Sequence, residues 1–261
     1  MQIRTFLSEL APFIYKQAYA CIFWGFFLSM LLLTKYYYPG DFPLHRYDFL
    51  FLSAIFFQIF LIITKLESWK EVGVIVVFHL VATGMELFKT APDIGSWSYP
   101  EAYIIGILGV PLFTGFMYSA VGSYITRVWR IFAFRFEHYP RRAYTVLIAI
   151  LIYINFFTHH YIYDFRYVLL IAILFAFGRT RIYFNPAKIY HSMNLVFGFS
   201  LVALFIWFAE NIGTFTKTWI YPSSAYGWFV VSPEKILAWF LLMIISFVLV
   251  SFVHTPQSYK K

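Results

Sequence analysis

Residues 236–253 read Ile-Leu-Ala-Trp-Phe-Leu-Leu-Met-Ile-Ile-Ser-Phe-Val-Leu-Val-Ser-Phe-Val, an apolar run without a charged side chain. A helix needs roughly 20 residues, within a range of about 17–25, to cross a hydrocarbon core about 30 Å thick. The whole chain of 261 residues is 61% hydrophobic and 12% charged, whereas soluble domains are about 45–50% apolar and about 25% charged. No water-soluble fold buries so much apolar surface. The sequence therefore predicts an all-α, polytopic bundle of transmembrane helices, and it excludes a cytosolic enzyme, a disordered protein and a secreted disulfide scaffold.

Similar apolar runs along the chain predict about eight spans within a single integral membrane domain, residues 1–261. The predicted spans are 18–34, 47–64, 72–89, 102–125, 144–157, 165–178, 192–209 and 236–253. The fifth and sixth are short, and the polar stretch 158–161 joins them, so a re-entrant hairpin is the alternative to two full crossings. No small-x-small cleavage site follows the first run, which favours a retained span over a cleaved signal peptide.

The lysines and arginines indicate the orientation of these spans. With the N-terminus inside, 14 of the 20 basic residues fall on inner segments and 6 on outer ones. By the positive-inside rule, this bias places both termini in the cytoplasm. The densest basic cluster, 127–142, is interpreted as an anchor on anionic headgroups, so membrane lipids are expected partners. Because the net charge of +8 resides in short loops between apolar runs, it does not indicate nucleic acid binding. The single Cys21 excludes an intrachain disulfide, and nothing in the sequence indicates an oligomeric state.

Two stretches that lie 122–124 residues apart share one pattern. In each, a glutamate at the predicted outer end of a helix, Glu86 or Glu210, precedes a Trp-x-Tyr-Pro segment, 97–100 or 219–222. A second pattern, an aspartate followed by an arginine, also recurs after about 120 residues: Asp41 with Arg46, and Asp164 with Arg166. Four spans in each half predict two parallel repeats, 1–126 and 127–261, related by an axis along the membrane normal. Coincidence in a chain with 24% aromatic residues is the alternative.

Ionisable side chains inside a span cost at least about 2.5–3.5 kcal/mol and are therefore candidates for function. His79, Thr83 and Glu86 lie on one face of the third predicted span, because seven residues make about two helical turns. Such a line would carry a proton or hold a polar headgroup. The alternative is a buried imidazole bonded to a neighbouring helix, with a solvated Glu86. If the repeat holds, Glu86 and Glu210 face one another near the outer surface as catalytic residues together with His79. The expected substrate-binding residues are Asn211 and the aromatic residues Trp97, Tyr99, Trp219 and Tyr221.

The sequence offers little support for a metal or a cofactor. His159, His160 and Asp164 supply imidazoles and a carboxylate, which ligate transition metals. Adjacent histidines on a helix point about 100° apart, however, so only one of them would face a given site. We expect an interfacial loop here and no metal or cofactor. Nucleotide-binding loops of the GxxxxGK[ST] type, GxSxG elbows and HExxH motifs are all missing from the sequence.

Small residues mark one stripe of the fourth predicted span. Gly115, Ser119 and Ser123 recur at intervals of four residues, with Gly122 beside them. Such a stripe lets a neighbouring helix approach closely, so we expect helix packing rather than a substrate groove. Pro111 is expected to kink the same helix.

Two stretches of the chain resemble the YoaT-like family. The first is 85–123, which contains Gly95-Ser96-Trp97-Ser98-Tyr99-Pro100-Glu101 and Pro111-Leu112-Phe113, and the second is 209–222. The resemblance extends over nearly the whole chain. It implies a multipass protein of the bacterial inner membrane and brings no known activity. The Trp-x-Tyr-Pro segment followed by Val110-Pro111-Leu112 is also similar to the membrane lycopene cyclase and carotenoid hydratase group. In that group acidic residues follow the proline and leucine, whereas this chain has Phe113-Thr114.

Two classes of function follow from these candidates. The first is a membrane-embedded enzyme that acts on a lipophilic molecule, an isoprenoid or a lipid, with Glu86 and Glu210 as the acid and base. The second is a proton-coupled transporter or binding protein for a small molecule, in which His79 and Glu86 couple to protons. A purely structural role is the third alternative.

Overall fold

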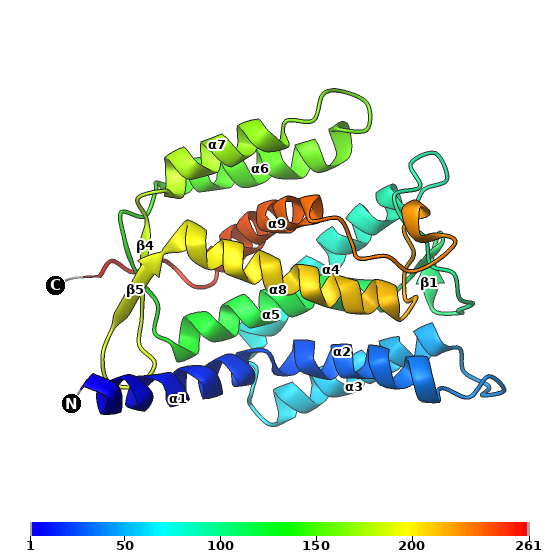
Figure 1. Ribbon diagram of the computed structural model, residues 1–261, viewed down its shortest axis with the longest axis horizontal. Helices are drawn as coiled ribbons and strands as arrows, with labels where there is room; N and C mark the ends of the chain where they lie inside the picture. Colours follow the sequence, from blue (N-terminus) through cyan, green and yellow to red (C-terminus); the bar gives the residue numbers. More distant parts are fainter. Residues whose placement is uncertain (1, 260–261) are drawn as a thin grey trace. The chain divides into compact units, whose positions relative to one another are not determined.

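The computed structural model describes residues 2–259, with side chains from Ser8 onward, and most of this part is helical (Figure 1). The helices are α1 (Gln2–Ala20), α2 (Ile22–Tyr37), α3 (Arg46–Ile63), α4 (Trp69–Lys89), α5 (Thr114–Ile131), α6 (Arg142–Thr158), α7 (Arg166–Phe177), α8 (Leu195–Phe215) and α9 (Glu234–Ser251), with a 3-10 turn at Pro222–Ser224. The short strands are β1 (Gly106–Ile107), β2 (Val110–Pro111), β3 (Arg135–Glu137), β4 (Arg181–Phe184) and β5 (His191–Asn194).

Within the described residues, four helices are long and apolar enough to cross a membrane: α3, α4, α8 and α9. They correspond to the predicted spans 47–64, 72–89, 192–209 and 236–253. Helix α1, from Ser8 onward, and α2 add a fifth candidate if the pair is counted as one broken span. Helices α6 and α7 are apolar but shorter, at 17 and 12 residues. At a rise of 1.5 Å per residue, α7 is only about 18 Å long.

Three predicted spans have different boundaries in the structure. The first predicted span, 18–34, is interrupted at Cys21, between α1 and α2. The predicted span 102–125 is helical only from Thr114, because β1 and β2 form a small antiparallel hairpin before it. The predicted span 192–209 begins at Leu195, after β5, and continues to Phe215, so that Glu210 lies inside α8 rather than at its end.

The hairpin has a clear local cause. Leu108 (φ 48°) and Gly109 (φ 86°) both adopt the left-handed conformation in its turn, which no helix accommodates. Pro111 lies in β2 and pairs with Gly106, so the expected proline kink in a helix is wrong. Pro111 precedes α5 instead of bending it.

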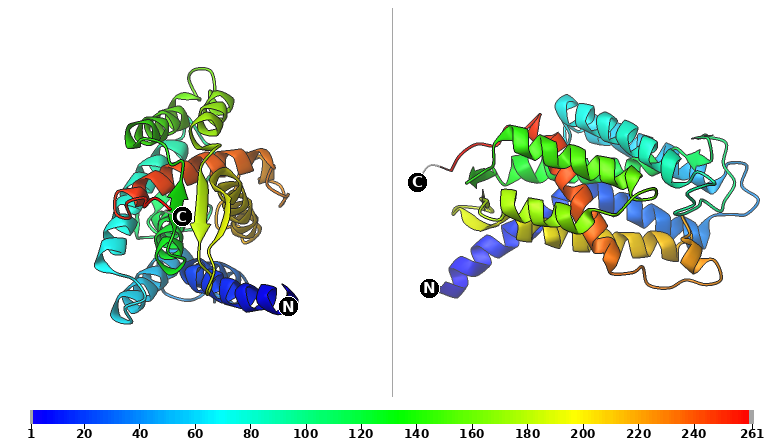
Figure 2. Two further views of the ribbon diagram at one scale, coloured as in Figure 1. Left: turned by 90° about the vertical axis from the view of Figure 1, so that its left-hand side faces the viewer. Right: turned by 90° about the horizontal axis from the view of Figure 1, so that it is seen from above.

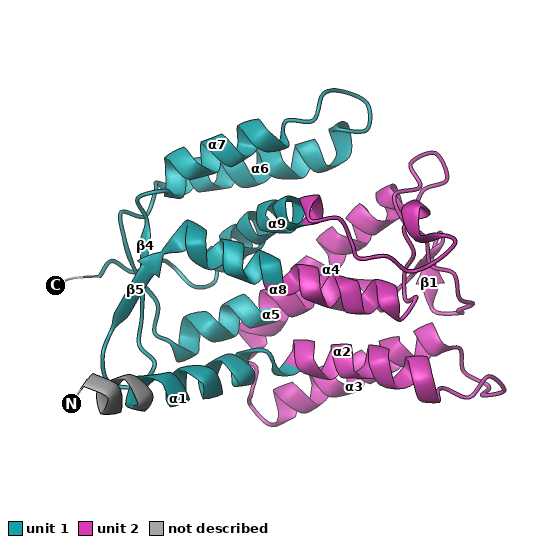
Figure 3. Cartoon of the chain, viewed as in Figure 1, with its two compact units in different colours: residues 1–22, 123–204, 236–261 teal, residues 23–122, 205–235 magenta. Residues whose placement is uncertain are grey.

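The chain divides into two compact units, each built from segments that are distant in the sequence (Figure 3). Unit 1 comprises 1–22, 123–204 and 236–261, and unit 2 comprises 23–122 and 205–235. The boundary between the predicted repeats, 126/127, does not separate them.

Unit 1 contains a three-stranded antiparallel sheet in the order β3-β4-β5. Figure 2 shows β4 and β5 running side by side as long yellow arrows. The chain end joins the same sheet, because Phe136 donates its N–H to the Gln257 carbonyl and accepts one from Tyr259. Buried Ala20, Val128 and Phe132 form a small core in this unit.

Unit 2 contains α2, α3, α4, the start of α5 and the end of α8, together with the β1–β2 hairpin. Two glycines let α5 approach α4. A Cβ at Gly115 would lie 2.2 Å from the His79 ring, and one at Gly122 would lie 3.0 Å from the Phe78 ring. The predicted packing role of the small-residue stripe is confirmed at these two positions.

Candidate functional site

The Glu86 carboxylate lies near the end of α4, is only 1% exposed and receives three hydrogen bonds from neutral groups. Trp97 Nε1 donates to it at 2.9 Å, the Tyr99 hydroxyl at 2.6 Å and the Tyr118 hydroxyl at 2.8 Å. Within the described chain, no lysine, arginine or histidine donates to this carboxylate. Trp97 and Tyr99 belong to the segment after α4, whereas Tyr118 belongs to α5. The prediction that Trp97 and Tyr99 accompany Glu86 agrees with this geometry.

Glu210 occupies a matching environment in α8, where it is 3% exposed. The hydroxyl of Tyr221, from the second Trp-x-Tyr-Pro segment, donates a short hydrogen bond to its carboxylate. Thus each glutamate is bonded by the tyrosine of its own segment. Asn211, the next residue of α8, connects two segments of the chain. Its amide group donates to the Trp207 carbonyl, and its side-chain oxygen accepts the N–H of Val231, so it holds the chain between α8 and α9.

The two Trp-x-Tyr-Pro segments pair with one another. Ser98 and Ile220, their second residues, exchange both backbone hydrogen bonds at 2.9 Å in an antiparallel bridge. This pairing places Trp97 against Tyr221, with ring centroids 6.2 Å apart. It also brings the two glutamates into one cluster, because Tyr221 lies within electrostatic range of both Glu210 and Glu86.

The tyrosines of these segments are held in their neutral form. Burial, followed by the neighbouring Glu86 carboxylate, raises the pKa of Tyr99 well above its ordinary value. Burial and the Glu210 carboxylate do the same to the pKa of Tyr221. Both hydroxyls therefore remain protonated donors throughout the neutral pH range.

Trp219 does not mirror Trp97. Its six-membered ring lies directly on Gly213 of α8, where a Cβ would come within 1.9 Å of the ring. Trp219 thus packs on the helix that carries Glu210, and Gly213 provides the space for it.

His79 is not joined to Glu86. Its imidazole faces Gly115 and lies edge-on to Phe116, at 5.0 Å between ring centroids. The Thr83 hydroxyl donates to the backbone carbonyl of His79, at 2.8 Å, rather than to a side chain. The expected line from His79 through Thr83 to Glu86 is therefore not a hydrogen-bonded chain in this structure.

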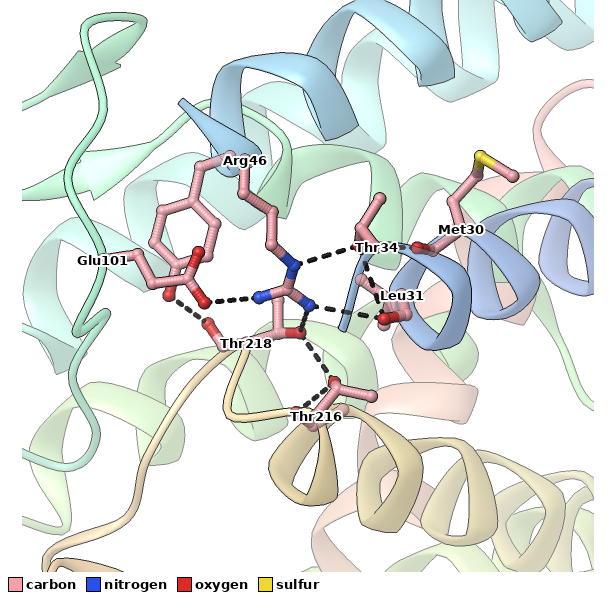
Figure 4. A network of polar contacts seen from close by, with 9 residues as sticks. Met30, Leu31, Thr34, Arg46, Glu101, Thr216 and Thr218 are labelled. Carbon is pink, nitrogen blue, oxygen red and sulfur yellow. Dashed lines mark hydrogen bonds and ion pairs between the residues drawn. The ribbon is translucent and has the colours of Figure 1, made fainter. Parts of the chain in front are cut away.

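Sequence reasoning missed a second polar network, around Arg46 (Figure 4). The Arg46 side chain, at the start of α3, is only 8% exposed. Its guanidinium binds Glu101 at 2.5 Å, the Thr34 hydroxyl at 2.9 Å and the Thr218 hydroxyl at 3.2 Å. The Leu31 carbonyl also accepts from it, at 3.3 Å. The network ties α2 and α3 to the segments that follow α4 and α8.

Two neighbours on α3 extend this attachment. The fully buried Asp48 carboxylate accepts the backbone N–H groups of Ile104 and Ile105 at 2.8–3.1 Å. The Tyr47 hydroxyl donates to the Thr218 carbonyl at 2.8 Å. The first turn of α3 therefore fixes both segments that contribute donors to the glutamates.

Comparisons with known proteins place the chain in a family. Residues 9–247 match the family model described as "Protein of unknown function (DUF817)". The chain is 37% identical, over 245 residues, to "Uncharacterized protein YoaT" of Bacillus subtilis (strain 168), covering 94% of this chain and 91% of that protein. The chain belongs to the DUF817 family. The resemblance to the YoaT-like family is confirmed, whereas the local similarity to lycopene cyclases is not shown by these matches. No solved structure matches the chain.

In this DUF817 protein the stretch 159–166 forms a structured turn before α7. The Asp164 carboxylate binds the Arg166 guanidinium at 2.5 Å and the Asn155 amide at 3.1 Å. Burial opposes these contacts, but the hydrogen bonds from Arg166 and Asn155 keep the pKa of Asp164 below its ordinary value. His159 and His160 stack on each other, at 4.1 Å between ring centroids. From residue 2 to residue 259, no three His, Cys, Asp or Glu side chains are grouped so that they could hold a metal ion.

Proposed function

We propose that this DUF817 protein is a proton-coupled carrier of a small molecule in the membrane and that Glu86 is its proton-binding group. The observation that supports this most directly is the set of partners of Glu86. The carboxylate is buried and bonded by three neutral donors, and among the described residues no cationic side chain bonds to it. A buried charge without a counter-ion is costly, especially within a membrane. A proton is the remaining counter-charge.

The origin of the three donors suggests how proton binding couples to movement. Trp97 and Tyr99 come from the segment between α4 and α5, and Tyr118 comes from α5 itself. A displacement of this segment would remove donors from Glu86 and change its affinity for a proton, because donors to the charged form stabilise that form. Binding of a solute against the segment and protonation of Glu86 would then depend on each other.

We also propose eight spans, with both termini on the cytoplasmic side of the bacterial inner membrane. Segments predicted to lie inside contact one another within unit 1. Glu9 accepts the N–H of Lys188 at 3.2 Å, and Phe136 pairs with the chain end. Segments predicted to lie outside contact one another within unit 2, where Arg46 binds Glu101 and Ser98 pairs with Ile220. The count of eight takes α1 and α2 as one broken span and includes α6 and α7.

Two parallel repeats, 1–126 and 127–261, belong to the same proposal. The matched bonds from Tyr99 to Glu86 and from Tyr221 to Glu210 support them. The antiparallel bridge between Ser98 and Ile220 adds to this support, because such a bridge has local two-fold symmetry.

The carrier proposal is tested in vesicles that contain the purified protein and an internal pH-sensitive dye. A panel of amines, carboxylates, sugars and amino acids is added outside, and the internal pH is followed. We expect at least one solute to change the internal pH in wild-type vesicles and to lose this effect in Glu86→Gln. Glu234→Gln, which alters an exposed carboxylate at the start of α9, is the control and keeps the response. If no solute changes the internal pH in wild-type vesicles, the proposal is wrong.

A membrane-embedded enzyme that acts on an isoprenoid or a lipid is the second candidate. It is favoured by the gathering of two carboxylates in one cluster, where Tyr118 lies within electrostatic range of both Glu86 and Glu210. Such a pair suits an acid and a base acting on one substrate. Mass spectrometry of lipid extracts distinguishes the two candidates. A product that appears with the wild-type protein and disappears with Glu210→Gln, while membrane insertion is unchanged, would favour the enzyme.

A further inference from the structure

The two Trp-x-Tyr-Pro segments place an ammonium group on aromatic faces. Lys235 Nζ lies 4.3 Å from the centroid of the Tyr221 ring and 6.0 Å from that of the Trp97 ring. The rings stand nearly perpendicular, at 80°, so they form two walls of a corner. Within about 6 Å of a ring centroid, a cation is attracted by the negative face of the ring. All three side chains are half-buried, so the corner can be reached from outside the protein.

The polar atoms of both rings strengthen this attraction. Trp97 donates its indole N–H to Glu86, and Tyr221 donates its hydroxyl to Glu210. The polar edge of each ring therefore points at a carboxylate. Aromatic rings whose polar edges are bonded to carboxylates make a site for a cation.

The helix that carries Lys235 does not itself favour a cation. Lys235 is the second residue of α9, and the N-terminus of a helix has a positive potential that favours anions. The aromatic corner thus offsets an unfavourable position for the ammonium. The two aromatic rings would attract a cation from outside the protein in the same way.

We propose that the corner formed by Trp97 and Tyr221 is a binding site for a small organic cation, an amine or a quaternary ammonium compound, and that the Lys235 ammonium is its internal competitor. The proposal deepens the proposed function, because it names the substrate class of the carrier. An organic cation that displaces Lys235 comes to lie beside the carboxylate cluster in place of the ammonium.

The probe for this proposal is choline, and its matched control is 3,3-dimethylbutan-1-ol, which has the same shape without the charge. Isothermal titration calorimetry measures the binding of both to the full-length protein in detergent. We expect Lys235→Met to bind choline roughly 10-fold more tightly than the wild type, because the internal competitor is gone. The neutral alcohol is expected to bind at least about 10-fold more weakly than choline. Lys217→Met, an exposed lysine of unit 2, is the control and leaves choline binding unchanged.

A second pair of variants tests the walls. Adding Trp97→Leu to Lys235→Met removes one aromatic face and should weaken choline binding by about 10-fold. If a variant does not fold, the wild type is titrated with choline and the alcohol instead, and equal binding of the two contradicts the proposal. Equal affinity of Lys235→Met and Lys217→Met for choline also contradicts it. Choline binding without solute-dependent pH changes in vesicles would leave the cation site standing and overturn the carrier function. Solute-dependent pH changes without choline binding would do the reverse.

Discussion

Glu86 and Glu101 are carboxylates of the same unit, but their partners differ in charge. Glu101 binds the Arg46 guanidinium, which is also held by two hydroxyls and a carbonyl. Glu86 accepts only from an indole and two phenol groups. The Arg46 network therefore pairs a cation with an anion. Among the described residues no cationic side chain donates to Glu86, which is what the proton-binding role proposed for it requires.

The difference suggests that the two networks of this region have different roles, one in stability and one in proton binding. The Arg46 network fixes the segments that follow α4 and α8, and those segments supply donors to Glu86 and Glu210. Substitutions in the first network should affect stability, and replacement of Glu86 by glutamine should affect proton binding without the same cost. Substitutions in either network test this comparison.

The largest expected effect is that of Arg46→Met. Removal of one member of a buried ion pair typically costs 3–5 kcal/mol, and since Glu101 is 34% exposed we expect about 3 kcal/mol. The measurement is thermal unfolding in detergent. Arg166→Met is the control, because Arg166 is 31% exposed where Arg46 is 8% exposed, and an arginine that water reaches contributes only about 0–1 kcal/mol through its ion pair. Similar losses for the two variants would show that the Arg46 network has no special structural role.

The second prediction concerns Glu86→Ala and Glu86→Gln. Alanine leaves three buried donors without an acceptor, and we expect a loss of about 2–3 kcal/mol. Glutamine keeps an acceptor and removes the unbalanced charge, so its stability should match the wild type within about 1 kcal/mol. Glu101→Gln, in contrast, leaves the Arg46 guanidinium without its anion and should be less stable than Glu86→Gln. If Glu86→Gln is the less stable of the two, the proposed contrast between the networks is wrong.

The parts of this fold that could be predicted are those with a repeated or uninterrupted pattern. Residues 236–253 carry no charged side chain and residues 47–64 carry only Asp48, so their length and composition are enough to make them candidate membrane helices. Glu86 was grouped with Trp97 and Tyr99 because the same spacing recurs around Glu210. Repetition thus compensated for the lack of any recognisable catalytic motif.

The remainder could not be predicted, for physical reasons. Residues 102–113 are as apolar as a span, and only the spacing of Gly106, Gly109 and Pro111 indicates a hairpin. Tyr118 is one of 21 tyrosines in the chain. Its position on the face shared by Gly115 and Gly122 was the available sign that it approaches α4. Burial of Arg46 depends on partners from distant segments, which a local pattern does not reveal.

Gly213→Ala should have a smaller effect than the Arg46 and Glu86→Ala changes. The added Cβ would meet the Trp219 ring at 1.9 Å and displace the segment that carries Tyr221. Overpacking of this kind costs typically 1–3 kcal/mol, and we expect about 2 kcal/mol. Gly84→Ala is the matched helical control, because nothing lies within 4 Å of its added Cβ and alanine favours a helix over glycine by about 1 kcal/mol. Thermal unfolding of both variants checks this, and equal stability would mean that Trp219 does not depend on Gly213.

The smallest expected effect is a loss of stability at alkaline pH. The pKa values of Tyr99 and Tyr221 are raised in the folded protein, whereas in the unfolded chain a tyrosine titrates near 10. The folded state therefore binds more protons than the unfolded state above about pH 10, and its stability falls as the pH rises through that range. Below about pH 10 this contribution is fully present. Tyr99→Phe should flatten the dependence of the unfolding temperature on pH, and Tyr226→Phe, at an exposed tyrosine, should not. If the slope is unchanged in Tyr99→Phe, the Tyr99 hydroxyl of the wild type does not belong to the cluster.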